Sequence, residues 1–172
     1  MRKIIGEKRI LFKGKFTIVN EYDLKDDGIE QVHKYECVDR GDSVAAMVFN
    51  PKTEKYYFVK QFRIGAQNEL VELVAGMFDR KTETPEAAIV REIEEELGFT
   101  VGPKSLKLLS HFYTSPGGLA EHMYLYYAET AAQIHDGGGI DDESIEIILM
   151  TKEELKQYPF EDAKTLVGCM FI

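Results

Sequence analysis

Three glutamates in one short stretch of the chain have the residue type and spacing for metal chemistry. Glu92, Glu95 and Glu96 lie three and four positions apart or side by side, so on a helix their side chains would share one patch. Three carboxylates on one patch repel each other, and a hard divalent cation removes that repulsion. The patch therefore predicts bound Mg²⁺ or Mn²⁺, which alone would make the acidic cluster tolerable. The alternative interpretation is a solvated acidic helix face.

The flanking residues predict the helix that would carry this patch. Thr84 followed by Pro85 is typical of a helix N-cap and first helical position, because the missing N–H of proline is not needed there. Gly98 is typical of a helix end, since glycine adopts a left-handed conformation without strain. We expect a helix between these signals. Its apolar stripe, at about 100° per residue, is formed by Val90, Ile93 and Leu97.

The wider spacing around the glutamates resembles the signature of the Nudix hydrolases. Gly76 and Glu83 are followed, seven residues after Glu83, by REIEEELGF at 91–99, which fills every fixed position of the family core REUXEEXGU. One departure is that six residues separate Gly76 from Glu83, where the family usually has five. The extra residue lengthens the loop before the helix and leaves the helix itself unchanged.

The resemblance implies an α+β fold of two parts. Residues 41–172 would form the Nudix domain, an α/β/α sandwich with a mixed central sheet. Residues 1–40 would form an N-terminal antiparallel strand layer, because residues 9–24 alternate around a turn at Gly14 and a return strand over 30–38 follows the Asp27-Gly28 hairpin signal. In the sugar-nucleotide branch of the family a similar segment builds a homodimer interface, which implies a homodimer here.

The same resemblance implies roles for residues of the signature. The metal ligands would be the carboxylates of Glu92, Glu95 and Glu96 and the backbone carbonyl of Ala75, with Glu95 also counted among the catalytic residues. Arg91 would orient Glu95 or Glu83 through a salt bridge rather than touch substrate. Glu83 would then support the site from outside the metal ligands.

A second informative stretch is the loop at 114–121, TSPGGLAE, where proline and paired glycines give backbone freedom. A lone glutamate at the end of such a loop is usually exposed and idle. Here the SPGG…E pattern is similar to the catalytic loop of ADP-ribose and GDP-mannose pyrophosphatases. The resemblance implies that Glu121 is the general base and that Gly118 contacts substrate.

Further substrate contacts are implied by DRGDSVAAMVFN…VKQFRIGA, which resembles the same enzymes. It points to Arg40 and, more strongly, Arg63, against the alternative of surface arginines. Glu72 occupies a position where relatives recognise substrate, although a capping or edge role fits it equally. For Glu143 and Glu146 one interpretation is an approach to the metal site. The better interpretation is that they belong to a solvated loop and a strand edge.

The remaining sequence patterns predict the other helices and strands of the sandwich. We expect a final helix over 163–172 with a buried apolar end, in the domain or across a dimer, and a mobile loop at the glycines 137–139. Thr151 and Glu154 have capping-box spacing for another helix. Apolar runs and alternation predict strands at 43–50, 56–63, 69–75, 104–113, 122–129 and 144–150.

Composition limits the partners and the setting. The 172 residues suit one domain, and the net charge of −9 argues against nucleic-acid binding. No apolar run approaches a membrane span and the N-terminus does not resemble a signal peptide, which indicates a cytoplasmic protein without a membrane partner. Cys37 and Cys169 have no ligand spacing, so we expect reduced thiols.

Together these features predict a Mg²⁺- or Mn²⁺-dependent pyrophosphatase that converts a nucleoside diphosphate sugar to a nucleoside monophosphate and a sugar phosphate. An acidic protein holds such a polyanion where cations reverse the local field. ADP-ribose is the first expectation for the substrate and GDP-mannose a close second. The alternative is a Nudix-fold sensor that binds a sugar nucleotide without cleaving it.

Overall fold

The computed structural model describes residues 1–79, 81–139 and 144–172, and the chain divides into two compact units. The first unit comprises Met1–Asp42 and Tyr113–His122. The second comprises Ser43–Phe112 and Met123–Ile172. The loop that carries Glu121 is therefore grouped with the N-terminal strands.

The first unit contains the predicted meander. Strands β1 (Arg2–Lys13), β2 (Ile18–Asp26) and β3 (Val32–Asp39) form an antiparallel sheet in the order β1-β2-β3. The turn at Gly28 uses the left-handed φ of 79° that glycine tolerates. β1 begins well before the alternating residues at 9–24 and pairs with β2 from Arg2 onward. In that first pair the guanidinium of Arg2 donates to Asp26 at 2.7 Å.

The second unit is built on a mixed sheet, as predicted. Its strand order among the described residues is β10-β5-β4-β9-β8, with β6 paired to β5 and β7 paired to β4. β4 runs antiparallel to β5 and parallel to β9. The strands are β4 (Asp42–Asn50), β5 (Lys55–Arg63), β6 (Asn68–Glu72), β7 (Val74–Phe78), β8 (Leu106–Tyr113), β9 (His122–Glu129) and β10 (Glu146–Met150).

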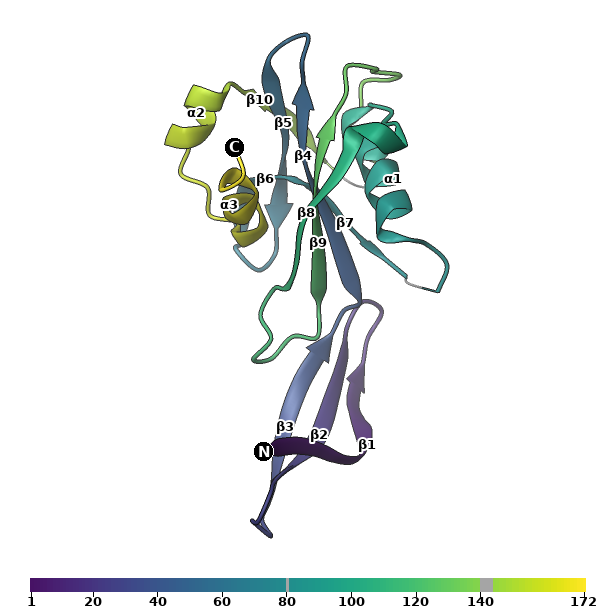
Figure 1. Ribbon diagram of the computed structural model, residues 1–172, viewed down its shortest axis with the longest axis vertical. Helices are drawn as coiled ribbons and strands as arrows, with labels where there is room; N and C mark the ends of the chain where they lie inside the picture. The colour runs from purple at the N-terminus through teal and green to yellow at the C-terminus, as the bar shows by residue number, and fades with distance from the viewer. Residues whose placement is uncertain (80, 140–143) are drawn as a thin grey trace. The chain divides into compact units, whose positions relative to one another are not determined.

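Helices cover both faces of this sheet (Figure 1). α1 (Pro85–Leu97) lies on one face, whereas α2 (Lys152–Gln157) and α3 (Ala163–Cys169) lie on the other; a short 3₁₀ turn, η1 (Pro103–Ser105), precedes β8. Successive residues of β4 point to opposite faces, so Val44 and Val48 pack in the cluster under α1 while Ala45 and Met47 pack in the second cluster. The α/β/α sandwich is confirmed.

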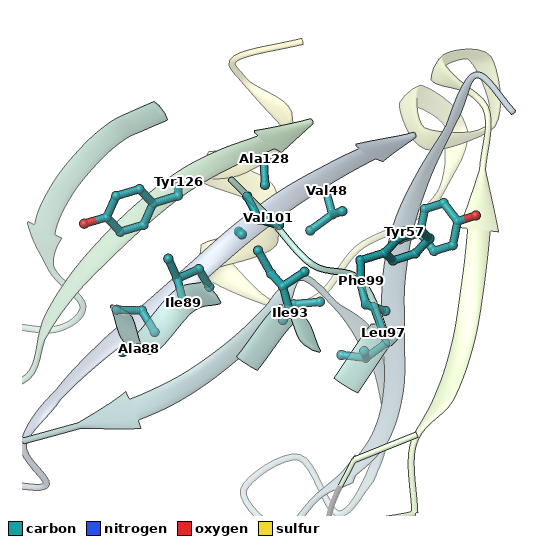
Figure 2. Close-up of a cluster of buried hydrophobic side chains, with 14 of the residues drawn as sticks. Val48, Tyr57, Ala88, Ile89, Ile93, Leu97, Phe99, Val101, Tyr126 and Ala128 are labelled. Atoms are coloured by element: carbon teal, nitrogen blue, oxygen red, sulfur yellow. The ribbon is translucent and has the colours of Figure 1, made fainter. Parts of the chain in front are cut away.

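The cluster under α1 fixes the helix that carries the glutamates (Figure 2). Ile89, Ile93 and Leu97 are fully buried there, each stabilising the fold by about 1.5–3 kcal/mol. Phe99, just past the helix, meets Tyr57 of β5 edge to face, with ring centroids 4.9 Å apart. Ile89 belongs to the buried stripe, and Val90, predicted as part of that stripe, is only partly buried.

The structure corrects two local predictions and adds contacts at a third position. The single strand expected at 69–75 is split at Leu73, because the Leu73 N–H donates to Thr165 Oγ1 at 2.9 Å instead of to a neighbouring strand. The last helix ends at Cys169 rather than at Ile172; Val167, Cys169 and Ile172 pack partly buried against the domain core, whereas Met170 is 82% exposed. At the glycines 137–139, where we expect a mobile loop, the Gly138 and Gly139 amides donate to carbonyls at the end of α1 and the Gly137 amide donates to His135 Nδ1.

Cys37 and Cys169 are free thiols, and burial raises the pKa of Cys169. Within the described residues, no helix combines the length and apolar character needed to cross a membrane.

Candidate metal and active site

Helix α1 has the ends that the sequence predicts. The Thr84 hydroxyl accepts the Ala87 N–H at 3.2 Å, and Pro85 is the first helical residue. Gly98 adopts φ 72° and donates its N–H to the carbonyl of Glu94 at 2.8 Å. The register of the helix is therefore fixed at both ends, and with it the directions of its glutamates.

Burial separates these glutamates from a solvated acidic face. Glu96 is only 4% exposed, and the side chains of Glu92 and Glu95 are 12% and 25% exposed. Glu94, on the other side of the helix, is exposed. Since a carboxylate is buried only at a cost that its surroundings must offset, the alternative interpretation holds for Glu94 and fails for the other three.

Arg91 lies at the centre of the carboxylates. One terminal nitrogen of its guanidinium donates to Glu92 at 2.8 Å and to Glu95 at 2.9 Å, and its Nε donates to Glu83 at 3.2 Å. The hydrogen bond to Glu83, ahead of the charge of Glu92, holds the pKa of Arg91 above its ordinary value despite partial burial. The expected salt bridges are present, and the extra residue after Gly76 does not keep Glu83 from them.

This arrangement corrects the expectation that only a metal makes the cluster tolerable. Arg91 already supplies a positive charge between Glu92 and Glu95. Across the part of the chain that the structure describes, no three His, Cys, Asp or Glu side chains are gathered as a formed metal centre.

The carboxylate of Glu92 lies against the backbone of β7. A Cβ atom added at Gly76 would stand 1.8 Å from Glu92 Oε1, so any other residue there would displace the Glu92 side chain. The carbonyl of Ala75 belongs to the adjoining residue, and Glu96 follows Glu92 by four positions on α1. Carboxylate and carbonyl oxygens are the donors that Mg²⁺ and Mn²⁺ prefer, and the residues present fit such an ion.

Arg63 and Glu72, both predicted to bind substrate, bind each other. Two nitrogens of Arg63 donate to the two oxygens of Glu72 at 2.7 and 2.8 Å, and Lys164 of α3 also donates to Glu72. Glu72 is 1% exposed. Burial alone would raise the pKa of Glu72, but the hydrogen bonds and charges of Arg63 and Lys164 outweigh it and lower that pKa.

The other predicted residues lie in the first unit. Gly118 accepts the Val38 N–H on its carbonyl at 2.8 Å, and Thr114 donates its hydroxyl to Glu121 at 3.3 Å. Arg40 is exposed directly after β3. Within the second unit, the structure thus brings Arg91 together with its three carboxylates and pairs Arg63 with Glu72. Action of Glu121, Gly118 and Arg40 at the same site stays a prediction.

Glu143 lies outside the described residues, whereas Glu146 is exposed on β10 and accepts from Lys60 at 3.1 Å, as a solvated strand edge would. Sequence reasoning missed Lys164, because 92 positions separate it from Glu72. Its only signal was its place two residues after Asp162, the N-cap of α3.

Comparison with known protein families identifies the family of this chain. A model of the NUDIX domain matches residues 39–167, which is most of the chain. The chain belongs to the Nudix family.

Similar proteins cover nearly the whole of this Nudix chain. A GDP-mannose pyrophosphatase of Cronobacter sakazakii (strain ATCC BAA-894) is 34% identical over 173 residues, covering 92% of this chain and 88% of the relative. A GDP-mannose pyrophosphatase of Enterobacter sp. (strain 638) is 33% identical over 184 residues, covering 99% and 94%. A crystal structure of an ADP compounds hydrolase shares the fold, with a TM-score of 0.77 at 18% identity, covering 98% of this chain and 90% of that one.

Proposed function

We propose that this Nudix hydrolase, an enzyme acting on diphosphate bonds, cleaves a nucleoside diphosphate sugar to a nucleoside monophosphate and a sugar phosphate, using Mg²⁺ or Mn²⁺. The observation that carries the proposal is the Glu92 carboxylate held against the backbone at Gly76, one helical turn from the buried Glu96. The relatives named GDP-mannose pyrophosphatase, which match over more than nine-tenths of the chain, support it.

The metal would be held by the carboxylates of Glu92 and Glu96 and the carbonyl of Ala75, with Glu95 sharing it. A bound divalent cation supplies positive charge to the diphosphate and makes an attacking water more acidic. Arg91 holds Glu92 and Glu95 in position through its hydrogen bonds. Arginine stays protonated in proteins, so this positive charge is always present beside the two carboxylates.

The remaining residues act on the substrate and the water. Glu121 takes a proton from the water as its oxygen bonds to phosphorus, and the bridging P–O bond breaks so that the leaving phosphate carries the bridging oxygen. Arg40 and Gly118 bind the substrate. Arg63 does so with its guanidinium plane fixed by Glu72, whose own oxygens are directed to Arg63 and Lys164.

For the substrate we place GDP-mannose first and ADP-ribose second, which reverses the order expected from the sequence. The reason is that the relatives at 33–34% identity are named for GDP-mannose. The similarity to the ADP compounds hydrolase, at 18% identity, supports only the fold.

The test is a panel of sugar nucleotides and nucleoside triphosphates incubated with Mg²⁺ or Mn²⁺ and alkaline phosphatase, which releases phosphate from the products but not from an intact nucleoside diphosphate sugar. We expect kcat/KM to be highest for GDP-mannose and turnover to vanish when EDTA is added. Binding of a sugar nucleotide without any phosphate release would favour the sensor. Faster release from a triphosphate in the absence of the phosphatase would point to another Nudix activity.

A further inference from the structure

A segment far away in sequence closes the end of the helix that carries the metal glutamates. We call residues 134–139 the glycine loop. The N–H groups of Gly138 and Gly139 donate to the carbonyls of Glu96 and Glu95 at 2.9 and 3.1 Å, and the Ile134 N–H donates to the carbonyl of Gly98 at 2.8 Å. The last carbonyls of a helix have no partner within it, and here the glycine loop supplies partners to two of them.

The two segments approach so closely that glycine is needed on both sides. Gly137 has φ 72°, and a Cβ atom there would stand 2.5 Å from the carbonyl oxygen of Glu96. Gly98 also has φ 72°, and its Cβ would stand 1.9 Å from the carbonyl oxygen of His135. His135 Nδ1 accepts the Gly137 N–H at 3.0 Å, which fixes the turn of the glycine loop. A side chain at either glycine would force the loop and the helix apart.

The glycine loop also changes the electrostatics at this end of the helix. The C-terminal end of a helix carries a partial negative charge, which favours basic residues and disfavours carboxylates. The last turn of α1 has no basic residue and contains Glu94, Glu95 and Glu96. The N–H dipoles of the glycine loop point at this end and offset its negative charge.

We infer that the glycine loop is a positioning element for the metal site: by holding the backbone of Glu95 and Glu96 it sets the direction of their carboxylates. This inference rests on the proposed metal-dependent function. Coupling between two binding events is reciprocal, so seating of the glycine loop strengthens metal binding and a bound metal ion stabilises the seated loop.

The test is Mn²⁺ binding by isothermal titration calorimetry to the wild type, Gly137→Ala and Gly28→Ala. Gly28 is the matched control, because its φ of 79° strains an alanine similarly while its Cβ would meet nothing within 4 Å. Groups that support metal ligands contribute about tenfold or more to affinity. We expect Gly137→Ala to raise the Kd for Mn²⁺ by about that factor, with Gly28→Ala equal to the wild type.

Equal Mn²⁺ affinity in all three proteins would overturn the inference and leave the proposed function standing, whereas no binding to the wild type would remove the metal-dependent function itself. If Gly137→Ala does not fold, amide hydrogen exchange of the wild type gives the answer. We expect saturating Mg²⁺ to slow exchange at the Gly138 and Gly139 amides but not at Gly28. Unchanged exchange at those two amides would contradict the coupling.

Discussion

Glu96 differs from the other glutamates of α1 by being almost completely buried, at 4% exposed. A solvated helix face therefore does not explain the position of its carboxylate, whereas a bound metal ion would. We predict that Glu96→Gln lowers Mg²⁺-dependent turnover about hundredfold or more, since an ion's stabilisation of the transition state is worth several kcal/mol. The measurement is kcat/KM across a Mg²⁺ titration, with circular dichroism to verify the fold.

Glu94→Gln is the matched control for this variant, because Glu94 lies in the same helix and is exposed. It should retain the activity of the wild type. Full activity in Glu96→Gln, or an equal loss in both variants, would remove Glu96 from the proposed metal ligands.

Gly76 supports a second prediction at the scale of one residue. An added Cβ there would overlap Glu92 Oε1 at 1.8 Å, so Gly76→Ala must displace the Glu92 carboxylate. A displacement of about 1 Å in a catalytic site costs on the order of a hundredfold in rate. We expect that loss in kcat/KM together with weaker Mg²⁺ dependence, and Gly65→Ala, whose Cβ would lie in open space, should behave as the wild type. An active Gly76→Ala would show that Glu92 need not lie there.

At the scale of elements, Glu72 joins β5, β6 and α3 through Arg63 and Lys164. Because its pKa is lowered in the folded state, its contribution is fully present above the unfolded pKa of about 4.3 and is lost as pH falls through the folded value. We predict that Glu72→Gln destabilises the protein by about 2 kcal/mol at neutral pH, less than a fully buried pair because Arg63 is partly exposed.

The measurement is urea unfolding of the wild type and Glu72→Gln from pH 7 down to about pH 3. The difference in the free energy of unfolding should shrink as the pH falls below about 4.3. A difference that stays constant with pH would mean that Glu72 contributes by packing rather than by charge.

Thr165 makes a second link between elements. Its hydroxyl accepts the buried Leu73 N–H at 2.9 Å and donates to Asp162 at 2.6 Å. Thr165→Val keeps the shape of the side chain but leaves that N–H without its acceptor, which costs about 1–3 kcal/mol. We predict this loss in thermal and urea unfolding, with Thr82→Val, an exposed threonine before α1, as the control. Unchanged stability of Thr165→Val would show that the split between β6 and β7 has another cause.

These links also show where prediction from sequence succeeds and fails. The bounds of α1 follow from signals within a few residues of each end, Thr84-Pro85 and Gly98, and the structure confirms them. The break at Leu73 depends on Thr165, and the contacts of Gly138 and Gly139 depend on the carbonyls of α1. Both contacts join residues about 40 to 90 positions apart, which local pattern rules do not encode.

The same distinction holds within the site. The spacing on one helix was enough to gather Glu92, Glu95 and Glu96, and the Nudix resemblance was enough to pair Arg91 with Glu83, which precedes the helix. Neither indicated that Arg91 would also bind Glu92, because side-chain directions depend on packing. Nor did either indicate Lys164, which the fold brings to Glu72 from another element.

At the scale of the whole molecule, the N-terminal sheet presents large apolar side chains to solvent. Ile10 and Phe12 of β1 are 59% and 58% exposed, and Tyr35 of β3 is 45% exposed. Exposed apolar groups gathered on one small sheet are typical of a surface that binds a partner. They support the homodimer that the Nudix resemblance implies, with the first unit as its interface.

We therefore predict that Phe12→Asp weakens dimerisation, because a charge would be buried where an aromatic ring anchors the contact. Loss of such an anchor costs about 2 kcal/mol or more, which is roughly a thirtyfold rise in the dimer Kd. Sedimentation equilibrium over a range of concentrations measures it. Ile64→Asp, which replaces an 88% exposed residue of the second unit, is the control and should leave the Kd unchanged. A wild type that is monomeric at all concentrations, or a larger effect of Ile64→Asp, would place the interface elsewhere or remove it.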